Sequence, residues 1–197
     1  LDPIDKDADG YYPSIFKILK EQVRGVKIAY YYNWADLINS INKKYIDEVS
    51  FQHNDRYDSN YQKALSFVVQ HKKEPTLVFL YSVHTDHAGH AHKWMSPQYI
   101  SAIEEADTAI GKFLDQLKAE NLFDDTYFLL ITDHGGINKG HGGVSMSEMQ
   151  IPWGITGPRI KKQGLAAFYN SNKNTSFAIA EIFNIKRKFL PKSWTGV

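Results

Sequence analysis

The sequence predicts an α/β fold in which a mainly parallel sheet is sandwiched by helices. Two apolar runs, TLVFLYSV from Thr76 and TYFLLIT from Thr126, lack the polar alternation of a half-exposed strand. Such runs are typical of strands that are covered on both faces, as in a parallel sheet. Segments with helical periodicity separate the strands along the chain, which is the order that α/β folds follow.

The first half of the chain is expected to alternate between helices and strands. Tyr12–Gln22 is predicted to be a helix, because it has a proline in its first turn and an apolar stripe at helical spacing. A glycine ends this helix, and Val26–Tyr32 is predicted to be a strand. A second helix is expected from Asn33 or Trp34 to about Lys44, and a third over Tyr57–His71.

The second half continues the same alternation. Thr76–Val83 is expected to be a buried strand, and Ser96 with Pro97 forms an N-cap for a helix that runs to about Glu120. Thr126–Thr132 is expected to be another buried strand, followed by a glycine-rich loop. Gln150–Thr156 is predicted to be a shorter strand and Asn174–Phe183 a late helix. Without a repeat or a linker, residues 1–197 are predicted to form a single α/β domain.

The composition excludes several classes of protein. There are 23 Lys and Arg against 22 Asp and Glu, so the formal net charge is +1. This balance argues against disorder through excess charge and against a nucleic-acid partner bound by bulk positive charge. No apolar run is long enough for a transmembrane helix, so no membrane partner is expected. There is no Cys, so histidines and carboxylates must hold any metal ion.

The chain starts with an acidic, turn-like segment, Leu1–Gly10, and its first residue is not Met. This segment has neither the basic region nor the apolar region of a signal peptide. We therefore expect the sequence to be the inside of a longer protein. The absence of Cys does not separate an exported protein from a cytosolic one.

Histidines gather in two clusters. Four of the 8 lie within His84–His92. Two more, His134 and His141, lie just before and within Gly135–Gly143, which has five glycines in nine residues. Each cluster follows a predicted buried strand. Ligands of α/β sheets bind beyond the carboxyl ends of the strands, so the two clusters are expected to converge at one end of the sheet.

Five residues of these clusters are candidate metal ligands. In D-x-x-G-H, Asp86 and His90 are four residues apart and can reach one ion from a turn or from a helix face, and Gly89 favours a turn. In TDHGG, Asp133 and His134 would point to opposite faces of a strand, but the strand breaks at the glycines, so both can face a metal ion. With His141 they resemble in type the ligand set of a hydrolytic zinc site.

Several neighbours of these ligands have more than one interpretation. His84, His87 and His92 are expected to lie on the surface or to support the ligands. Trp94 either borders the pocket or packs under the helix that follows it.

The motifs resemble the type I phosphodiesterase/nucleotide pyrophosphatase branch of the alkaline phosphatase superfamily. The stretch from YSVHTDHAGHAH to the end of the long helix is similar to that branch's D-x-x-G-H loop and following helix. LLITDHGG is similar to its second metal motif, and GHGG with EMQIPWGITG to its third-ligand loop and next strand. PSIFKILKEQ, VKIAYYYNW and the closing LPKSWTGV also resemble family segments, so the likeness covers nearly the whole chain from Tyr12.

The resemblance implies a two-zinc site that this chain holds only in part. By position, Asp86, His90 and His141 would hold one zinc ion, and Asp133 and His134 the other. The family's remaining ligand, an Asp on the first strand, and its Thr or Ser nucleophile would precede residue 1. The fold is then alkaline phosphatase-like without its N-terminal strand, the C-terminal two-thirds of a larger catalytic domain. Ser14, Ser82 and Thr85 do not stand in the nucleophile's context.

The resemblance also implies a function with alternatives. The expected activity is metal-dependent hydrolysis of a small phosphorylated substrate: a phosphodiester, a phosphomonoester or a nucleotide pyrophosphate. A non-catalytic metal-binding or interaction domain, a sulfatase, and a phosphomutase that uses manganese instead of zinc stay open. Exposed strand edges would favour self-association. The family resemblance slightly favours a periplasmic or secreted location, but the sequence does not fix the compartment.

Overall fold

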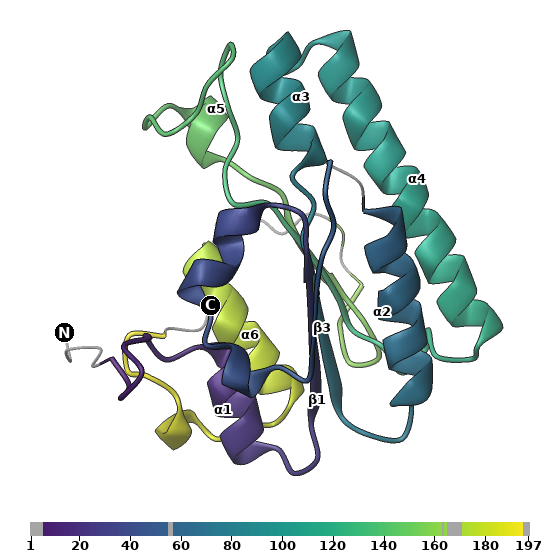
Figure 1. Cartoon of the computed structure of the whole chain (residues 1–197), viewed down its shortest axis with the longest axis vertical. Coiled ribbons are helices and arrows are strands. Elements are labelled where there is room, and N and C mark those ends of the chain that lie inside the picture. The colour runs from purple at the N-terminus through teal and green to yellow at the C-terminus, as the bar shows by residue number, and fades with distance from the viewer. Residues whose placement is uncertain (1–5, 55–56, 163, 165–170, 195–197) are drawn as a thin grey trace.

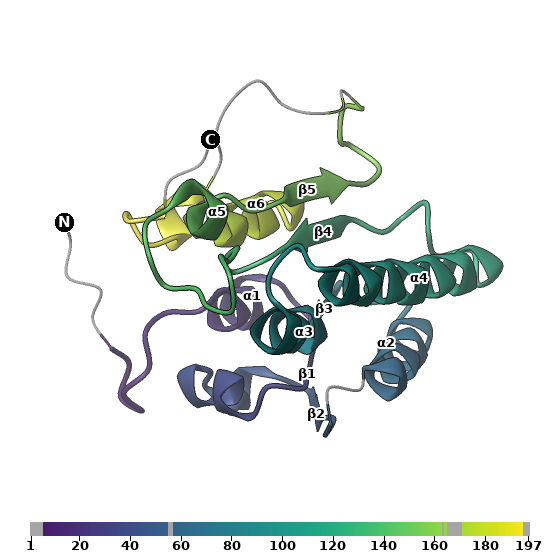
Figure 2. The same cartoon turned by 90° about the horizontal axis from the view of Figure 1, so that it is seen from above.

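Three parallel strands in the order β2–β1–β3 form the main sheet (Figure 1). The computed structural model describes residues 6–54, 57–162, 164 and 171–194. The strands are β1 (Lys27–Tyr32), β2 (Glu48–Phe51) and β3 (Thr76–Leu80). On the side of β3 away from β1 lies an antiparallel pair, β4 (Phe128–Ile131) and β5 (Trp153–Thr156) (Figure 2). The predicted α/β class with a mainly parallel sheet is therefore confirmed.

Helices cover both faces of the main sheet. Figure 2 shows α1 (Ile15–Gln22) and α6 (Thr175–Ile182) on one side and α2 (Asp58–Gln70) and α4 (Pro97–Ala119) on the other. All four helices were predicted, and each begins within three residues of its predicted start. The Ser14 hydroxyl caps α1, and the Ser96 hydroxyl accepts the N–H of Tyr99 at the start of α4.

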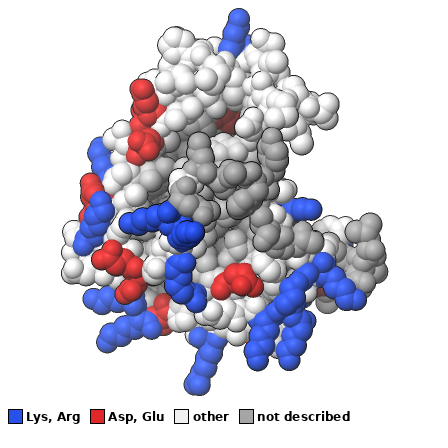
Figure 3. Space-filling model, turned by 180° about the vertical axis from the view of Figure 1, so that it is seen from behind, with Lys and Arg blue, Asp and Glu red and all other residues white. Residues whose placement is uncertain are grey.

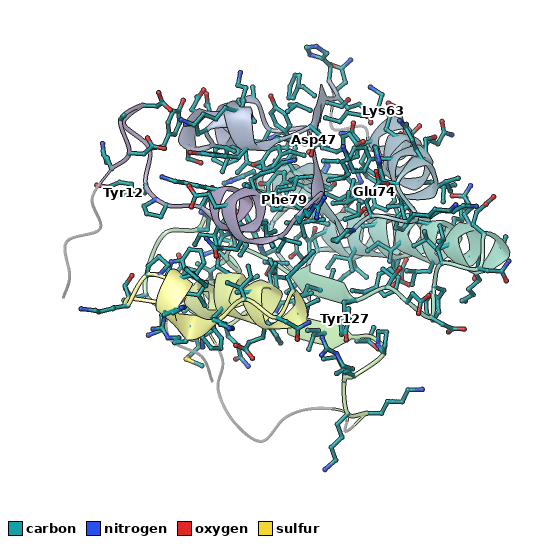
Figure 4. The ribbon with its side chains drawn as sticks, turned by 90° about the horizontal axis from the view of Figure 1, so that it is seen from below. Tyr12, Asp47, Lys63, Glu74, Phe79 and Tyr127 are labelled. Atoms are coloured by element: carbon teal, nitrogen blue, oxygen red, sulfur yellow. The ribbon has the colours of Figure 1, made fainter. Side chains whose placement is uncertain are left out.

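The core is centred on β1, whose side chains are buried on both faces. Ile28, Tyr30 and Tyr32 pack toward α1 and α6, whereas Ala29 and Tyr31 pack toward α2. Tyr30 is stacked on Phe79 of β3 with ring centroids 4.5 Å apart. Figure 4 shows Phe79 beside α1, the helix whose Phe16 meets it edge-on. A strand that is apolar on both faces is what a covered parallel sheet requires.

Two elements of the first half differ from the prediction. The helix expected from Asn33 or Trp34 to Lys44 is wrong: the segment forms two 3₁₀ helices, Ala35–Ser40 and Lys43–Tyr45. Ile41 between them is extended, and the Asn42 side chain accepts the N–H of Lys44, which starts a new turn instead of continuing the helix. Strand β2 was not among the elements that the sequence predicted.

The facing edges of β3 and β4 are unpaired in the part of the chain that the structure describes. β3 pairs with β1 and β4 with β5, and no described ladder joins the two sheets. Leu130 of β4 is 57% exposed and Ile131 36%, so the expectation that this strand is buried is wrong. The apolar sequence suits a central strand, but β4 has a neighbour on only one edge.

Two short helices lie at the carboxyl end of the parallel strands. α3 (His84–His92) follows β3, and α5 (Met146–Met149) belongs to the segment between β4 and β5 (Figure 1). The Gly-rich stretch 135–143 leads from β4 to α5. This edge of the sheet therefore carries both histidine clusters.

The face of the molecule in Figure 3 is mixed in charge, with Lys and Arg interspersed with Asp and Glu. None of the helices among the described residues is long and apolar enough to cross a membrane. Of the predicted segments, residues 1–5 of the acidic start and residues 195–197 of the closing LPKSWTGV lie outside the described residues.

Candidate metal centre

The candidate ligands lie on two segments that follow neighbouring strands. Asp86 and His90 are on α3, which begins four residues after β3 ends. Asp133, His134 and His141 are on the loop that follows β4. The ligand atoms of Asp86, His90 and His141 all lie within 4.8 Å of one another. The structure thus brings together, at the carboxyl edge of the sheet, residues that are 55 positions apart in the sequence (141 − 86).

Asp86 and His90 meet on a helix, so the expectation of a turn at Gly89 is wrong. α3 is helical through Gly89, and the spacing of four places both side chains on one face. Gly89 has another reason to be glycine: a Cβ there would lie 2.8 Å from ring atoms of Trp94. The glycine provides room for an indole rather than freedom for a turn.

The Asp86 carboxylate is the centre of the cluster. Its Oδ2 lies 3.5 Å from Nε2 of His90, and its Oδ1 lies 3.5 Å from Nε2 of His141 and 3.9 Å from Nε2 of His134. The rings of His134 and His141 are stacked with centroids 3.7 Å apart. One carboxylate is therefore surrounded by three imidazole nitrogens.

Backbone carbonyls set which ring nitrogen faces the carboxylate. Nδ1 of His90 lies 2.8 Å from the carbonyl oxygen of Lys139, and Nδ1 of His134 lies 2.8 Å from that of Gly135. A carbonyl can only accept, so Nδ1 carries the proton that it donates. In a neutral imidazole the lone pair is then on Nε2, the atom that faces Asp86. Fixing the ring in this way is typical of histidines that bind metal ions.

The cluster is short of donors. Oδ1 of Asp86 is buried and has no hydrogen-bond partner among the described residues. The Nε2 lone pairs of His90 and His134 and the Asp86 carboxylate are all acceptors, and they face one another at distances too long for hydrogen bonds. A buried acceptor without a donor is costly. A cation among these atoms would remove that cost, so the residues present fit a metal ion.

Asp133 lies at the exposed rim of the cluster. Its side chain is 57% exposed, and its Oδ1 is 3.7 Å from Nε2 of His134. The same oxygen accepts the backbone N–H of His134. Burial raises the pKa of the nearby Tyr81 hydroxyl, and the negative charges of Asp133 and Asp86 raise it further. Tyr81 is therefore a protonated donor beside the carboxylates.

Trp94 holds the two ligand segments together and borders the candidate centre, which is one of its two predicted interpretations. The indole lies between Gly89 of α3 and Gly136 of the loop, where an added Cβ would come within 2.2 Å of it. The rings of His90 and His141 meet it edge-on, and its backbone N–H donates to the carbonyl of Asn138. The glycines on both sides were the available signal in the sequence, but their common partner was not visible there.

Glu148 fixes the loop that carries His141. It is N3 of a capping box with Ser145 at the start of α5, and its Oε1 also accepts the N–H of Gly143. The Ser145 hydroxyl and the Gly143 N–H hold the pKa of Glu148 below its usual range. The backbone N–H of Gly135 donates to the Glu148 carbonyl, which joins α5 to the end of β4. Sequence reasoning missed this residue, although S-x-x-E is a known signal for a helix start.

Two serines, Ser14 and Ser82, are hydroxyl residues whose surroundings can be compared with those of a nucleophile. The Ser14 hydroxyl accepts the N–H of Lys17 and caps α1. Ser82 is next to Tyr81, and its hydroxyl is buried without a partner among the described residues. Neither observation identifies a nucleophile.

Comparisons with known proteins identify the family of this chain. The fold and the cluster place the chain among α/β proteins with an Asp/His site at the carboxyl edge of the sheet. A model of the family described as type I phosphodiesterase / nucleotide pyrophosphatase matches residues 5–149. The chain belongs to this family, and the predicted likeness to the alkaline phosphatase superfamily is confirmed.

Similar proteins include a fungal and two snake venom phosphodiesterases. An uncharacterized pyrophosphatase/phosphodiesterase of Schizosaccharomyces pombe is 34% identical over 64 residues, which cover 32% of this chain and 13% of that protein. Venom phosphodiesterase 2 of Crotalus adamanteus is 33% identical over 63 residues, 32% of this chain and 8% of that protein. Venom phosphodiesterase CdcPDE of Crotalus durissus collilineatus is 28% identical over 116 residues, which cover 57% of this chain and 14% of that protein. The matched part thus spans 8–14% of the length of these relatives.

Proposed function

We propose that this chain is the metal-binding part of a hydrolase that cleaves phosphoric esters. The substrate class is a phosphodiester, a phosphomonoester or a nucleotide pyrophosphate. The family match and the relatives named pyrophosphatase/phosphodiesterase support this assignment. The observation that carries it is the buried Asp86 oxygen, which has no donor among the described residues and faces Nε2 of His134 and of His141.

The donor set favours zinc. Asp86, His90 and His141 would hold one ion, and Asp133 with His134 would contribute to a second. Imidazole and carboxylate without thiolate form the ligand set of hydrolytic zinc sites, and three protein ligands leave a position open. Manganese is the less favoured alternative, because it prefers oxygen ligands. A bound zinc ion would supply a Lewis acid at a phosphoryl oxygen.

The chain's own residues would orient the ligands and bind the substrate phosphate. The carbonyls of Lys139 and Gly135 keep the His90 and His134 rings in place through their Nδ1 protons. Trp94 packs edge-on against the His90 and His141 rings on one side of the cluster. The Tyr81 hydroxyl, which burial keeps protonated, would donate a hydrogen bond to a phosphate oxygen.

The nucleophile would come from residues that precede this sequence. We propose that residues 1–197 are the C-terminal part of a larger catalytic domain, whose first strand would lie between β3 and β4. The unpaired edges of these strands and the exposed Leu130 support this placement. The small share of the relatives' length that the chain matches is compatible with it.

Zinc analysis combined with a hydrolysis assay tests the proposal. The 197-residue chain and a longer protein that includes the preceding residues are each assayed with zinc on bis-p-nitrophenyl phosphate. We expect both to bind zinc and only the longer protein to turn over, since a missing nucleophile costs many orders of magnitude in rate. Asp86→Asn should abolish the turnover of the longer protein. Absence of zinc binding and of hydrolysis in the longer protein would favour a non-catalytic domain.

A further inference from the structure

α3 carries three more histidines besides the candidate ligand His90. At 100° per residue, His84 and His92 lie about 140° from the mean direction of Asp86 and His90, whereas His87 lies between the two sides, about 60° from both His84 and His90. They line a hollow of about 460 Å³ in the seam between α3 and α4. The proposed function uses none of these three side chains.

One cross-helix contact in the hollow is already formed. Nε2 of His84 lies 3.1 Å from Oε2 of Glu105, which is on α4. The His84 side chain is 27% exposed and that of Glu105 61%, so the pair is open to small solutes. Three alanines, Ala88, Ala91 and Ala102, also line the hollow and leave its floor free of bulky side chains.

The spacing of the histidines suits chelation. His84 and His87 are at i and i+3 on α3, where helix side chains are neighbours. A ligand pair at i and i+3 combined with a carboxylate from a facing helix is how helical proteins assemble metal sites. Two imidazoles and one carboxylate suit a divalent transition ion and leave coordination positions open for water.

We propose that His84, His87 and Glu105 bind a divalent transition-metal ion such as Zn²⁺ in the seam between α3 and α4. This site is separate from the candidate metal centre and does not depend on the proposed function. Among the described residues, Asp86, His90 and His141 form the only group of three whose ligand atoms are mutually within 4.8 Å. The exposed His87 ring must therefore turn toward the His84–Glu105 pair when the ion binds, so this site is weaker than the first.

A calorimetric Zn²⁺ titration of the whole chain and of four variants tests the site. The wild type should show two classes of binding, and Asp86→Asn should lose only the tighter one. His84→Asn, His87→Asn and Glu105→Gln should each weaken the second class at least tenfold and leave the tighter class unchanged. Circular dichroism spectra would establish that each variant is folded.

His92→Asn is the matched control. His92 lines the same hollow, but it is eight residues from His84, about 12 Å along the helix axis, and cannot share its ion. It should retain both binding classes. A second class that persists in the other three variants, or that His92→Asn weakens equally, would overturn the proposal. Loss of the tighter class alone would count against the candidate metal centre and not against this site.

Discussion

At the scale of single residues, the candidate centre is a carboxylate without enough donors. Asp86 contacts His90, His134 and His141, yet its buried Oδ1 accepts no hydrogen bond. In a metal-free protein this arrangement costs free energy, because an unpaired buried acceptor has lost its water. A bound cation, as proposed above, would satisfy this acceptor.

Asp86→Asn should separate these two effects. The amide can donate to an imidazole Nε2, so the metal-free variant should be at least as stable as the wild type. Its zinc affinity should fall by more than the roughly 10–100-fold that a change in a supporting residue costs. Thermal unfolding with and without ZnCl₂ measures both: zinc should raise the wild-type Tm and leave that of the variant nearly unchanged. An equal zinc-dependent rise in both proteins would refute the role of Asp86.

A second residue-scale prediction concerns Asp47, whose position Figure 4 shows. Its Oδ2 accepts from Nζ of Lys20 at 2.6 Å and from the N–H of Ile28 at 2.7 Å, which ties α1 to β1. Burial works to raise the pKa of Asp47, but these two donors outweigh it and hold the pKa below the ordinary 3.8. The stabilisation is therefore complete above pH 3.8 and is lost as the pH falls through the folded-state pKa.

Asp47→Asn should then destabilise the protein by about 1 kcal/mol at pH 7. The difference between variant and wild type should shrink below pH 3.8, where the wild-type carboxyl also becomes protonated. Urea unfolding of both proteins at pH 7 and near pH 3 measures this. A difference that is independent of pH would show that the charge of Asp47 contributes nothing.

At the scale of elements, packing decides what the glycines do. α3 contains Gly89 and α4 contains Gly111, and both are helical. A Cβ at Gly89 would meet the Trp94 ring at 2.8 Å, whereas nothing lies within 4 Å of one at Gly111. The two glycines are both helical, but only Gly89 lies where a side chain would clash with its surroundings.

The two glycines form a matched pair for mutation. Gly111→Ala should stabilise the protein by about 0.5–1 kcal/mol, because alanine favours a helix more than glycine does. Gly89→Ala should instead destabilise it by about 1–3 kcal/mol, because the methyl group displaces Trp94. It should also weaken zinc binding, since Trp94 sets the distance between α3 and the His141 loop. Urea unfolding and zinc titration of both variants check this. If both substitutions stabilised the protein, Trp94 would not need the space beside Gly89.

At the scale of the whole molecule, two incomplete sheets stand side by side. β3 and β4 each have an edge without a partner in the described structure, and β4 exposes Leu130. Free apolar edges are templates for pairing with other chains. The isolated chain should therefore self-associate as its concentration rises.

Leu130→Lys should reduce this association without unfolding the chain. The side chain is already 57% exposed, so the lysine costs little burial and places a charge beside the open edge. Ile103→Lys is the control, because Ile103 is an exposed apolar residue of α4, 41% exposed, and not on a strand edge. Sedimentation velocity at several concentrations should show less association only for Leu130→Lys. A wild-type chain that stays monomeric, or an equal effect of both lysines, would argue against edge pairing.

The sequence by itself determined the α/β class and the segments that carry the site. Apolar runs and capping residues are short-range signals, so they predicted β1, β3, α2 and α4, and they placed Asp86 and His134 after strands. The family resemblance added the expected ligand sets, which stay predictions for this chain.

Only the tertiary structure decided how those segments meet. Gly89 looks like a turn signal in the sequence, but it lies within the helix α3. A glycine is needed there because the indole of Trp94 occupies the space of a side chain. Nothing local indicates that Lys139 orients His90 or that Asp86 faces both His134 and His141, because these contacts join residues about 50 positions apart. The exposure of β4 likewise depends on which strands lie beside it. Periodicity in a sequence reports on residues that are close along the chain. Some of the residues that orient the candidate ligands or make room for Trp94 are far from them in the sequence and meet them only in the folded structure.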